Sequence, residues 1–195
     1  MLIERSSKFE AVQGVVQTIH AELVRWEIFP VVDKEVGEAY QLAVDLIGPN
    51  IAHPETLRRV HEQTGAGLFV AREHGALSGV LALILLNQAG LRAVRADSLD
   101  GLDPSPAQII RRGEEPSALY AWGMAATSLR TAQRLIQGYI GIDRVAVPHL
   151  DCYGRPATRA GERLMTGRLG FKPLRRSTTG VVCRTPITHV EAAAA

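Results

Sequence analysis

The chain has 195 residues, of which 46% are hydrophobic and 22% are charged. That length suits a single globular domain with a full core, and the composition argues against a disordered chain or a coiled coil. The 22 basic side chains are nearly balanced by 20 acidic ones, giving a net charge of +2, whereas a dedicated nucleic-acid binder needs a dense cationic surface. We therefore expect no nucleic-acid partner.

The sequence also argues against disulfides, metal sites and membrane spans. Cys152 and Cys183 lie far apart and form no CxxC pair, so neither a disulfide framework nor a zinc site is predicted. Met1 to Glu10 lacks the apolar core of a signal peptide, and the longest apolar run, Val80 to Leu86, is too short to cross a bilayer. We expect a cytoplasmic protein with no metal and no membrane partner.

The first third of the chain is mainly helical by its pattern. Apolar residues recur at three- and four-residue steps from Phe9 to Val24, which predicts an amphipathic helix, and a short strand follows from Trp26 to Val32. Asp33 is a predicted cap for a helix that ends before Gly48. Another helix is predicted from about Pro54 to Gln63.

The middle of the chain reads as strands around one irregular segment. Two apolar runs, Leu68 to Ala71 and Leu77 to Leu86, flank a polar turn containing Gly75, which predicts an antiparallel hairpin. The segment from Asn87 to Pro116 is polar and rich in turn residues, a pattern typical of a lid or a binding loop. A third apolar strand is predicted from Leu119 to Ala126.

Two more helices and further strands follow. A helix capped by Thr127 or Ser128 should run to about Tyr139, and a strand from Arg144 to Leu150 should then lie parallel to the strand before the helix. A last helix is predicted from near Pro156 to Leu169, followed by a hairpin that turns at Thr179 and Gly180.

The order of these elements from Trp26 onward resembles the GNAT-type N-acetyltransferase superfamily. Gly67 to Leu86 (GLFVAREHGALSGVLALILL) looks like the second and third strands of that family, and Arg168 to Lys172 (RLGFK) is similar to its kLGF pattern. The resemblance covers about 160 residues. It implies a mixed α/β (α+β) fold with a mostly antiparallel central sheet of about six to seven strands, flanked by helices and preceded by an extra N-terminal helix. We predict one domain, with a helical extension at 1–25, a core at 26–184 and a tail at 185–195.

The resemblance also implies acetyl-CoA or another acyl-CoA as cosubstrate. In that family the fourth and fifth strands splay apart around the pantetheine arm, and the loop after the fourth strand cradles the pyrophosphate at a helix N-terminus. The positions that match are Met124, Ala125, Ala126, Thr127, Ser128, Arg130, Thr131 and Ala132. Only Ala132 fits the family's Q/R-x-x-G-x-G/A loop, because this chain lacks its glycines. Arg130 either supplies a cation to the phosphates or blocks the cradle. For Thr127 and Ser128 a helix-capping role is favoured over ligand contact, although one helix end can serve both.

The proton donor and the base are less directly indicated. The family's acid, a Tyr in the last helix, corresponds to Thr166, whose hydroxyl pKa is too high for that role. The nearest substitute is Tyr153, which can also simply shield a strand end. Candidate bases are His149, whose imidazole titrates near neutral pH, Asp151, and Glu114 or Glu115.

Three functions remain open from the sequence. The first is an acyl-CoA-dependent N-acyltransferase acting on a small amine. The oligomeric state is left open, although exposed strand edges and the helix from Phe9 to Val24 could support a homodimer. The second is a GNAT-like domain without acetyl transfer that serves as a binding or interaction module, as the altered phosphate loop would allow. The third is a hydrolase with Cys152 as nucleophile and His149 as its base.

Overall fold

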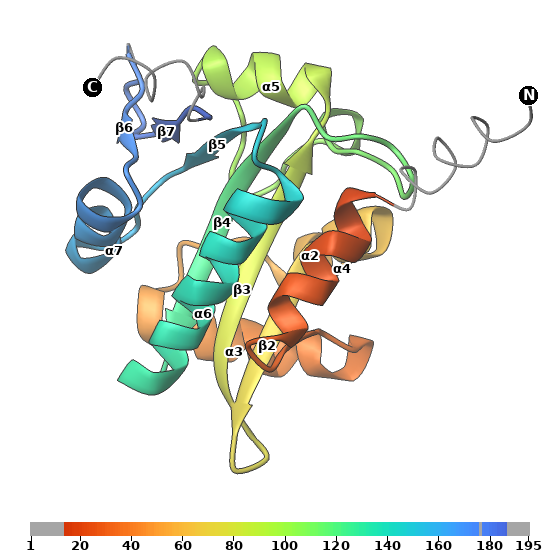
Figure 1. The fold of residues 1–195 in the computed structure, drawn as a ribbon, viewed down its shortest axis with the longest axis vertical. Coiled ribbons are helices and arrows are strands. Elements are labelled where there is room, and N and C mark those ends of the chain that lie inside the picture. The colour runs from red at the N-terminus through yellow and green to blue at the C-terminus, as the bar shows by residue number, and fades with distance from the viewer. Residues whose placement is uncertain (1–13, 176, 187–195) are drawn as a thin grey trace, which may run out of the picture.

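A computed structural model describes residues 14–175 and 177–186 of the chain (Figure 1). They form a seven-stranded sheet in the order β1-β2-β3-β4-β5-β7-β6. The strands are β1 (Ile28–Pro30), β2 (Leu68–Glu73), β3 (Ala76–Leu86), β4 (Ala118–Ala126), β5 (Asp151–Gly154), β6 (Lys172–Pro173) and β7 (Val182–Arg184). Every neighbouring pair is antiparallel except β4 and β5. The predicted mixed fold with a mostly antiparallel sheet is confirmed.

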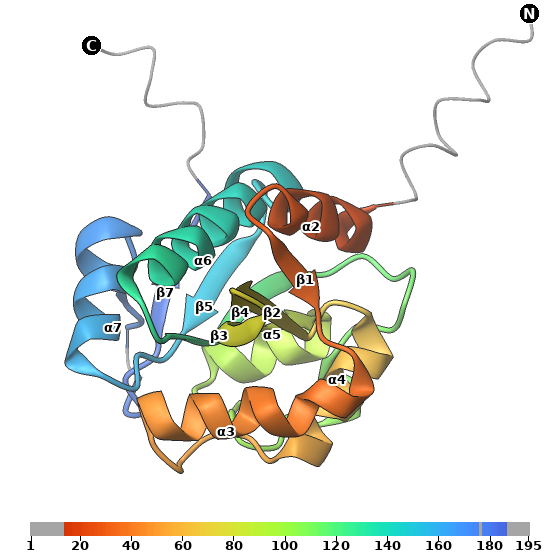
Figure 2. The ribbon, with the colours of Figure 1, turned by 90° about the horizontal axis from the view of Figure 1, so that it is seen from below.

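Helices cover both faces of the sheet (Figure 2). They are α2 (Val15–Val24), α3 (Val36–Ile47), α4 (Pro54–Thr64), α5 (Gln88–Arg95), α6 (Leu129–Gly141) and α7 (Arg159–Arg163). The side chains of β3 alternate between the faces: Leu81 and Leu83 pack beneath α2 and α6, whereas Val80 packs beneath α3 and α4. The core therefore has two layers, one on each side of β3 and β4. The predicted helix from Phe9 to Val24 begins outside the described residues.

The β2–β3 hairpin forms as its sequence predicts. Its turn consists of His74 and Gly75, both with positive φ, the conformation that a two-residue hairpin turn requires. The predicted cap at Asp33 is different, because Asp33 lies in a short 3₁₀ helix and pairs with Arg58. At that helix start the Glu35 carboxylate accepts the backbone N–H of Val32 instead, at 3.1 Å.

The predicted strand from Arg144 to Leu150 is wrong. Helix α6 runs into a π-helical turn at Ile142–Ala146, where the N–H of Val147 bonds the carbonyl of Ile142 at 3.0 Å. Ile142 and Val147 are fully buried, so an apolar run that reads as a strand instead packs as a helix end. Strand β5 begins only at Asp151. The predicted parallel pairing with β4 is right, but it uses residues further along the chain.

The segment from Asn87 to Pro116 contains a helix that the sequence did not reveal. Asn87 caps α5, its side chain accepting the N–H groups of Ala89 at 2.9 Å and Gly90 at 3.1 Å. Leu91 and Val94 then pack against the sheet in the same cluster as Tyr120 and Tyr153. Within the part of the chain that is described, every helix is too short or too polar to span a bilayer.

Candidate functional site

Strands β4 and β5 separate partway along their length. They pair over Ala118–Ala121 and Asp151–Gly154, after which β5 ends. Strand β4 continues to Ala126 along β3. Among the described residues, no strand therefore pairs with the other edge of β4 from Trp122 to Ala126. The two strands form a wedge that opens beyond their parallel pairing.

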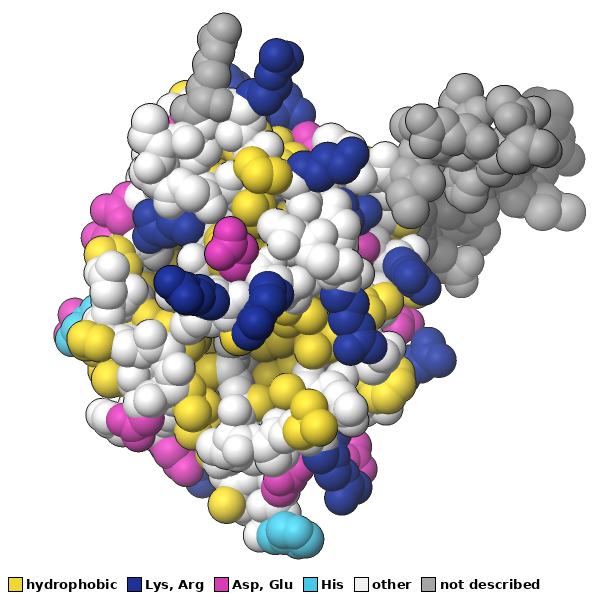
Figure 3. Space-filling view, turned by 90° about the vertical axis from the view of Figure 1, so that its left-hand side faces the viewer, with side chains coloured by type: hydrophobic (Ala, Val, Ile, Leu, Met, Phe, Trp, Pro, Cys, Tyr) yellow, Lys and Arg dark blue, Asp and Glu magenta, His cyan; other side chains and the backbone are white. Residues whose placement is uncertain are grey.

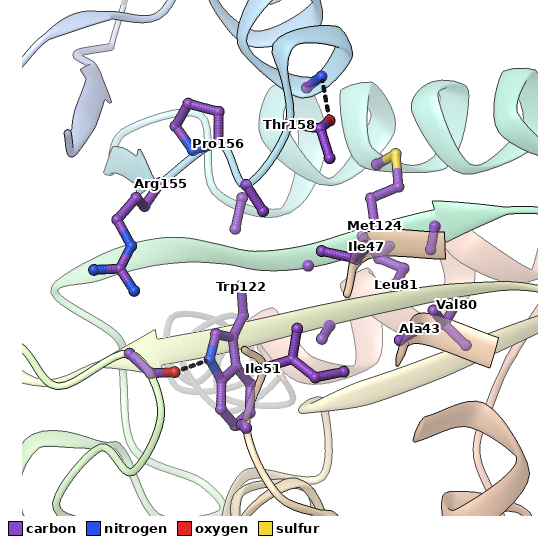
Figure 4. Close-up of a pocket in the computed structure, with 18 of the residues that line it drawn as sticks. Ala43, Ile47, Ile51, Val80, Leu81, Trp122, Met124, Arg155, Pro156 and Thr158 are labelled. Carbon is purple, nitrogen blue, oxygen red and sulfur yellow. Dashed lines mark hydrogen bonds between the residues drawn. The ribbon is translucent and has the colours of Figure 1, made fainter. Parts of the chain in front are cut away.

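A β-bulge lies where the wedge opens. Ala82 of β3 faces Gly123 and Leu83 faces Ala121, which makes Trp122 an extra residue in β4. A bulge bends its strand and turns a side chain to a new direction. The indole Nε1 of Trp122 donates a hydrogen bond of 2.6 Å to the carbonyl of Gly101, as Figure 4 shows. The loop after α5 is thereby fixed to the mouth of the wedge.

The wedge opens into a cavity of about 740 Å³. On the α6 and α7 side it is lined by Ile136, Leu164 and Met165, and on the α3 side by Ala43 and Ile47. It therefore passes from one face of the sheet to the other through the gap between β4 and β5. Figure 3 shows a hollow with an apolar floor on this side of the molecule, with Lys and Arg side chains along its rim.

The cavity offers few polar groups. Among the described residues that line it, Arg155 is the only one with a charged side chain, and none is Asp, Glu, His or Lys. Two tyrosines also line it. Tyr120 is 4% exposed, and burial raises the pKa of its hydroxyl although Arg155 opposes the shift. Tyr139 is buried, its hydroxyl has no hydrogen-bond partner in the described residues, and burial raises its pKa strongly. Both hydroxyls therefore stay protonated at neutral pH.

The N-terminus of α6 lies directly after β4. Ser128 caps it, its Oγ accepting the N–H of Thr131 at 3.0 Å, so the capping role predicted for Ser128 is confirmed. Ser128 and Thr131 also donate their hydroxyl protons to the Glu73 carboxylate, at 3.0 and 2.8 Å. These hydrogen bonds, the one from Thr131 first, lower the pKa of Glu73, which is therefore charged. The N–H groups of Leu129 and Arg130 have no acceptor among the described residues.

The predicted cofactor-binding residues divide into two groups. Met124, Ala125, Ala126 and Ala132 line the cavity. The other four, Thr127, Ser128, Arg130 and Thr131, do not line it. The Thr127 hydroxyl donates to the carbonyl of Ser78 at 3.2 Å, and the Arg130 side chain is exposed without an ion pair to any described residue.

The predicted catalytic residues lie outside the cavity. Asp151 Oδ2 accepts hydrogen bonds from Arg95 at 2.7 Å and from Tyr153 at 3.1 Å, and Tyr153 is buried beside α5. His149 is exposed in the turn before β5, upstream of the point where the wedge opens. None of Tyr153, His149 and Asp151 lines the cavity. Their catalytic roles stay predictions from the sequence.

The remaining candidates are also placed elsewhere. Glu114 and Glu115 line a second cavity of about 440 Å³. The Thr166 hydroxyl donates to the carbonyl of Glu162 at 2.8 Å, within its own helix. Burial raises the pKa of the Cys152 thiol to about 12. The thiol donates to Asp143 at 3.2 Å and accepts from Arg184 at 3.5 Å, and it makes no hydrogen bond to His149. A buried thiol that holds its proton is a poor nucleophile, which argues against the hydrolase hypothesis.

No group of three or more metal-ligating side chains occurs in residues 14–175 and 177–186.

No family model and no curated protein matches this sequence. Solved structures do match. The GNAT-like decarboxylase GphF, in complex with isobutyryl-CoA, aligns with 81% of this chain and 98% of its own, at a TM-score of 0.50 and 17% identity. The chain has a GNAT-type fold. A second match is the structure described as histone acetyltransferase HPA2 and related acetyltransferase from Corynebacterium glutamicum. It covers 84% of this chain and 97% of its own, at a TM-score of 0.48 and 19% identity. The GNAT architecture predicted from the sequence is confirmed.

Proposed function

We propose that the protein binds an acyl-CoA in the wedge between β4 and β5 and transfers its acyl group to a small amine. The observation that carries the proposal is the unpaired edge of β4 from Trp122 to Ala126, which borders a cavity of about 740 Å³. The pantetheine arm of CoA is extended and carries amides. Such an arm can hydrogen-bond to an open strand edge as another strand would. The match to a GNAT-like decarboxylase in complex with isobutyryl-CoA supports an acyl-CoA as the ligand.

The residues present fit the two ends of CoA unequally. The thioester end meets an apolar cavity and the open strand edge. The phosphate end would meet the free N–H groups of Leu129 and Arg130 at the start of α6, where the helix dipole favours an anion. The exposed guanidinium of Arg130 can add a cation, whereas the charged Glu73 carboxylate opposes binding of the phosphates. The Arg130 side chain and the free N–H groups of the first turn of α6 would thus bind the phosphates in place of the glycine-rich loop of the GNAT family.

Acyl transfer needs a proton donor for the departing sulfur. The amine nitrogen forms a bond to the acyl carbon while the carbon–sulfur bond breaks. The sulfur takes up a proton from the donor, and the nitrogen loses one to solvent, from which the donor is reprotonated, so that a neutral amide and a neutral thiol result. We assign that proton to the Tyr120 hydroxyl, because Tyr120 lines the cavity and its phenol is more acidic than a Thr hydroxyl, although burial raises its pKa and so makes it a weaker donor than an exposed tyrosine. The lining contains no carboxylate or imidazole among the described residues, so the amine must react in its neutral form or lose its proton to water.

The alternative is a GNAT domain that binds a ligand without transferring an acyl group. Two observations favour it: the described residues of the cavity lining include no carboxylate or imidazole, and Glu73 places a negative charge beside the expected phosphate position. Binding and turnover therefore have to be measured separately.

A binding measurement with matched variants tests the proposal. Acetyl-CoA at about one hundred times its dissociation constant should raise the melting temperature by about 5 to 10 °C. Gly123→Leu should abolish that shift, because Gly123 lines the cavity and a new side chain would enter it, the nearest atom to an added Cβ being 3.9 Å away. Gly37→Leu is the control, since Gly37 is exposed on α3 with open space around it.

No shift in melting temperature with millimolar acetyl-CoA would overturn acyl-CoA binding. A shift without thiol release in the presence of amines would favour the binding module.

A further inference from the structure

The part of the cavity beneath α3 differs chemically from the part beside α6. We call it the α3 chamber, and its walls are Ala43 and Ile47 of α3, Ile51, Leu57 of α4, Val80 of β3 and Trp122 of β4. Figure 4 shows Ala43, Ile47, Ile51 and Val80 on this side, with Trp122 beside them. All six side chains are hydrocarbon except for the indole N–H of Trp122. That group already donates to the carbonyl of Gly101.

Small residues keep the chamber open. Ala39 and Ala43 lie one helical turn apart on the face of α3 that packs on the sheet, and Ala82 lies in the sheet beneath that helix. Larger side chains at these positions would fill the space between helix and sheet, as a close-packed core normally does. An apolar space of this kind holds hydrocarbon rather than ordered water.

The chemistry of these walls selects against a charged occupant. Moving an ammonium or a carboxylate from water into such surroundings is costly unless a charged or hydrogen-bonding partner compensates. The only charged side chain among the described lining residues is Arg155, which lies near Tyr120 and Gly101 rather than beside α3. Among the described residues at the α3 wall, an amine acceptor would find no charged partner, and Asn50, in the loop after α3, is the one amide side chain of the lining. A hydrocarbon chain would contact the apolar walls of the chamber instead.

The chamber adjoins the point where the acyl group would lie. Trp122 and Gly123 line the cavity at the bulge, where β4 parts from β5. An arm that follows the open edge of β4 would bring its thioester to this bulge, and a chain longer than acetyl would then extend toward α3. We propose that the α3 chamber holds the hydrocarbon part of a branched or medium-length acyl group of about four to eight carbons. This inference rests on the proposed acyl-CoA site and names the substrate class that the site prefers.

Calorimetric titration of the full chain with a series of acyl-CoAs tests the inference. CoA, acetyl-, butyryl-, isobutyryl-, hexanoyl- and octanoyl-CoA are compared under one buffer condition. Each added methylene that enters the chamber should lower the dissociation constant by about two- to fourfold. We expect butyryl- and hexanoyl-CoA to bind more tightly than acetyl-CoA, with the gain levelling off once the chamber is full.

Two variants on the same helix locate the effect. Ala43→Phe should remove most of the gain between acetyl- and hexanoyl-CoA, because the ring would occupy the chamber. Leu46→Phe is the control, since Leu46 is 42% exposed on another face of α3 and should leave the whole series as in the wild type. If Ala43→Phe does not fold, the series on the wild-type protein still decides the question.

Several outcomes would overturn the inference while leaving acyl-CoA binding intact. A series that is flat, or tightest at acetyl-CoA, would show that the chamber does not receive the acyl chain. Tighter binding of succinyl-CoA than of butyryl-CoA would show that Arg155 selects a carboxylate instead. If phenethylamine weakens the binding of hexanoyl-CoA but leaves the binding of CoA unchanged, the chamber holds the amine acceptor instead of the acyl chain. If neither CoA nor any thioester binds, the proposed function itself fails and this inference fails with it.

Discussion

The Glu73 carboxylate accepts a hydrogen bond of 2.8 Å from the Thr131 hydroxyl in the first turn of α6. A negative charge thus lies at the helix N-terminus, where a pyrophosphate is expected to bind. Glu73→Gln keeps a side-chain oxygen for Thr131 and Ser128 but removes the charge. We expect CoA to bind about two- to fivefold more tightly to this variant at low salt, with the difference shrinking as salt is added. Calorimetric titration at two ionic strengths measures both effects.

A thioester without phosphates provides the control for Glu73. S-acetyl-N-acetylcysteamine carries the reacting end of acetyl-CoA but no negative charge. It should bind the wild type and Glu73→Gln equally, because the charge at position 73 acts only on the phosphates. An improvement for both ligands would mean that the substitution reshapes the cavity rather than relieving repulsion.

Removal of the Tyr120 hydroxyl should slow the chemical step. Tyr120→Phe keeps the ring that packs against α5 but removes the proton that we assign to the departing sulfur. We expect kcat to fall by about 100-fold with little change in KM, because the hydroxyl acts in the transition state. Thiol release by the purified variant gives both constants. Tyr40→Phe on α3 is the control, since Tyr40 does not line the cavity. Equal kcat values for wild type and Tyr120→Phe would rule out this assignment.

The pH dependence of turnover should follow the acceptor rather than the protein. The described cavity lining offers no carboxylate or imidazole, so the reactive fraction is the amine that is already neutral. Below the pKa of the amine, kcat/KM should rise about tenfold per pH unit. Burial raises the pKa of Tyr120, so its proton is retained and no fall is expected at neutral or mildly alkaline pH. Two amines of different pKa distinguish deprotonation in solution from deprotonation by the protein. If kcat/KM reaches its plateau at the same pH for both amines, a base on the protein takes the proton.

The sequence predicted the elements whose local signals agree with their packing. The β2–β3 hairpin combines alternating apolar residues with a turn at His74 and Gly75, and the structure contains it. Strand β5 was misplaced because Ile142 and Val147 are buried, and an apolar run does not reveal whether it packs as strand or helix. Helix α5 was missed because it has only eight residues and opens a segment rich in turn residues, although Leu91 and Val94 lie on one helical face.

The site was harder to predict than the fold, for a related reason. Met124 to Ala126, which the family resemblance assigns to cofactor binding, line the cavity, and that role stays a prediction. Ala43 and Ile47 carry only the signal of an apolar helix face, which in most proteins fills the core. Whether such a face leaves a cavity depends on the summed volumes of side chains from several elements. Tyr120 gives no signal either, because an aromatic residue inside a strand is usually part of the core.

Asp97 connects the end of α5 to the turn between β6 and β7. Its carboxylate accepts the backbone N–H groups of Thr178 at 2.6 Å and Thr179 at 3.1 Å, together with hydroxyls of Ser177, Thr178 and Thr179. The hydrogen bonds from Thr179 and Thr178 hold the pKa of Asp97 well below its usual range. Thr179 also lines the large cavity, so this turn forms part of its wall.

Asp97→Asn tests how much the charge of that carboxylate contributes to stability. Asn tolerates the positive φ of 56° at this position, so the substitution removes charge and acceptor capacity without straining the backbone. We expect the melting temperature at pH 7 to fall by about 2 to 6 °C. A carboxyl whose folded pKa is depressed stabilises the protein above its unfolded pKa of about 3.9, and that contribution is lost as the pH falls further. The difference in melting temperature between wild type and variant should therefore stay constant from about pH 6 to 9 and shrink below about pH 4.

Asp45→Asn is the control, because Asp45 is an exposed carboxylate bonded to Gln41, and it should show neither effect. A difference that grows on acidification would contradict the assignment, because it would require Asp97 to be more easily protonated in the folded protein.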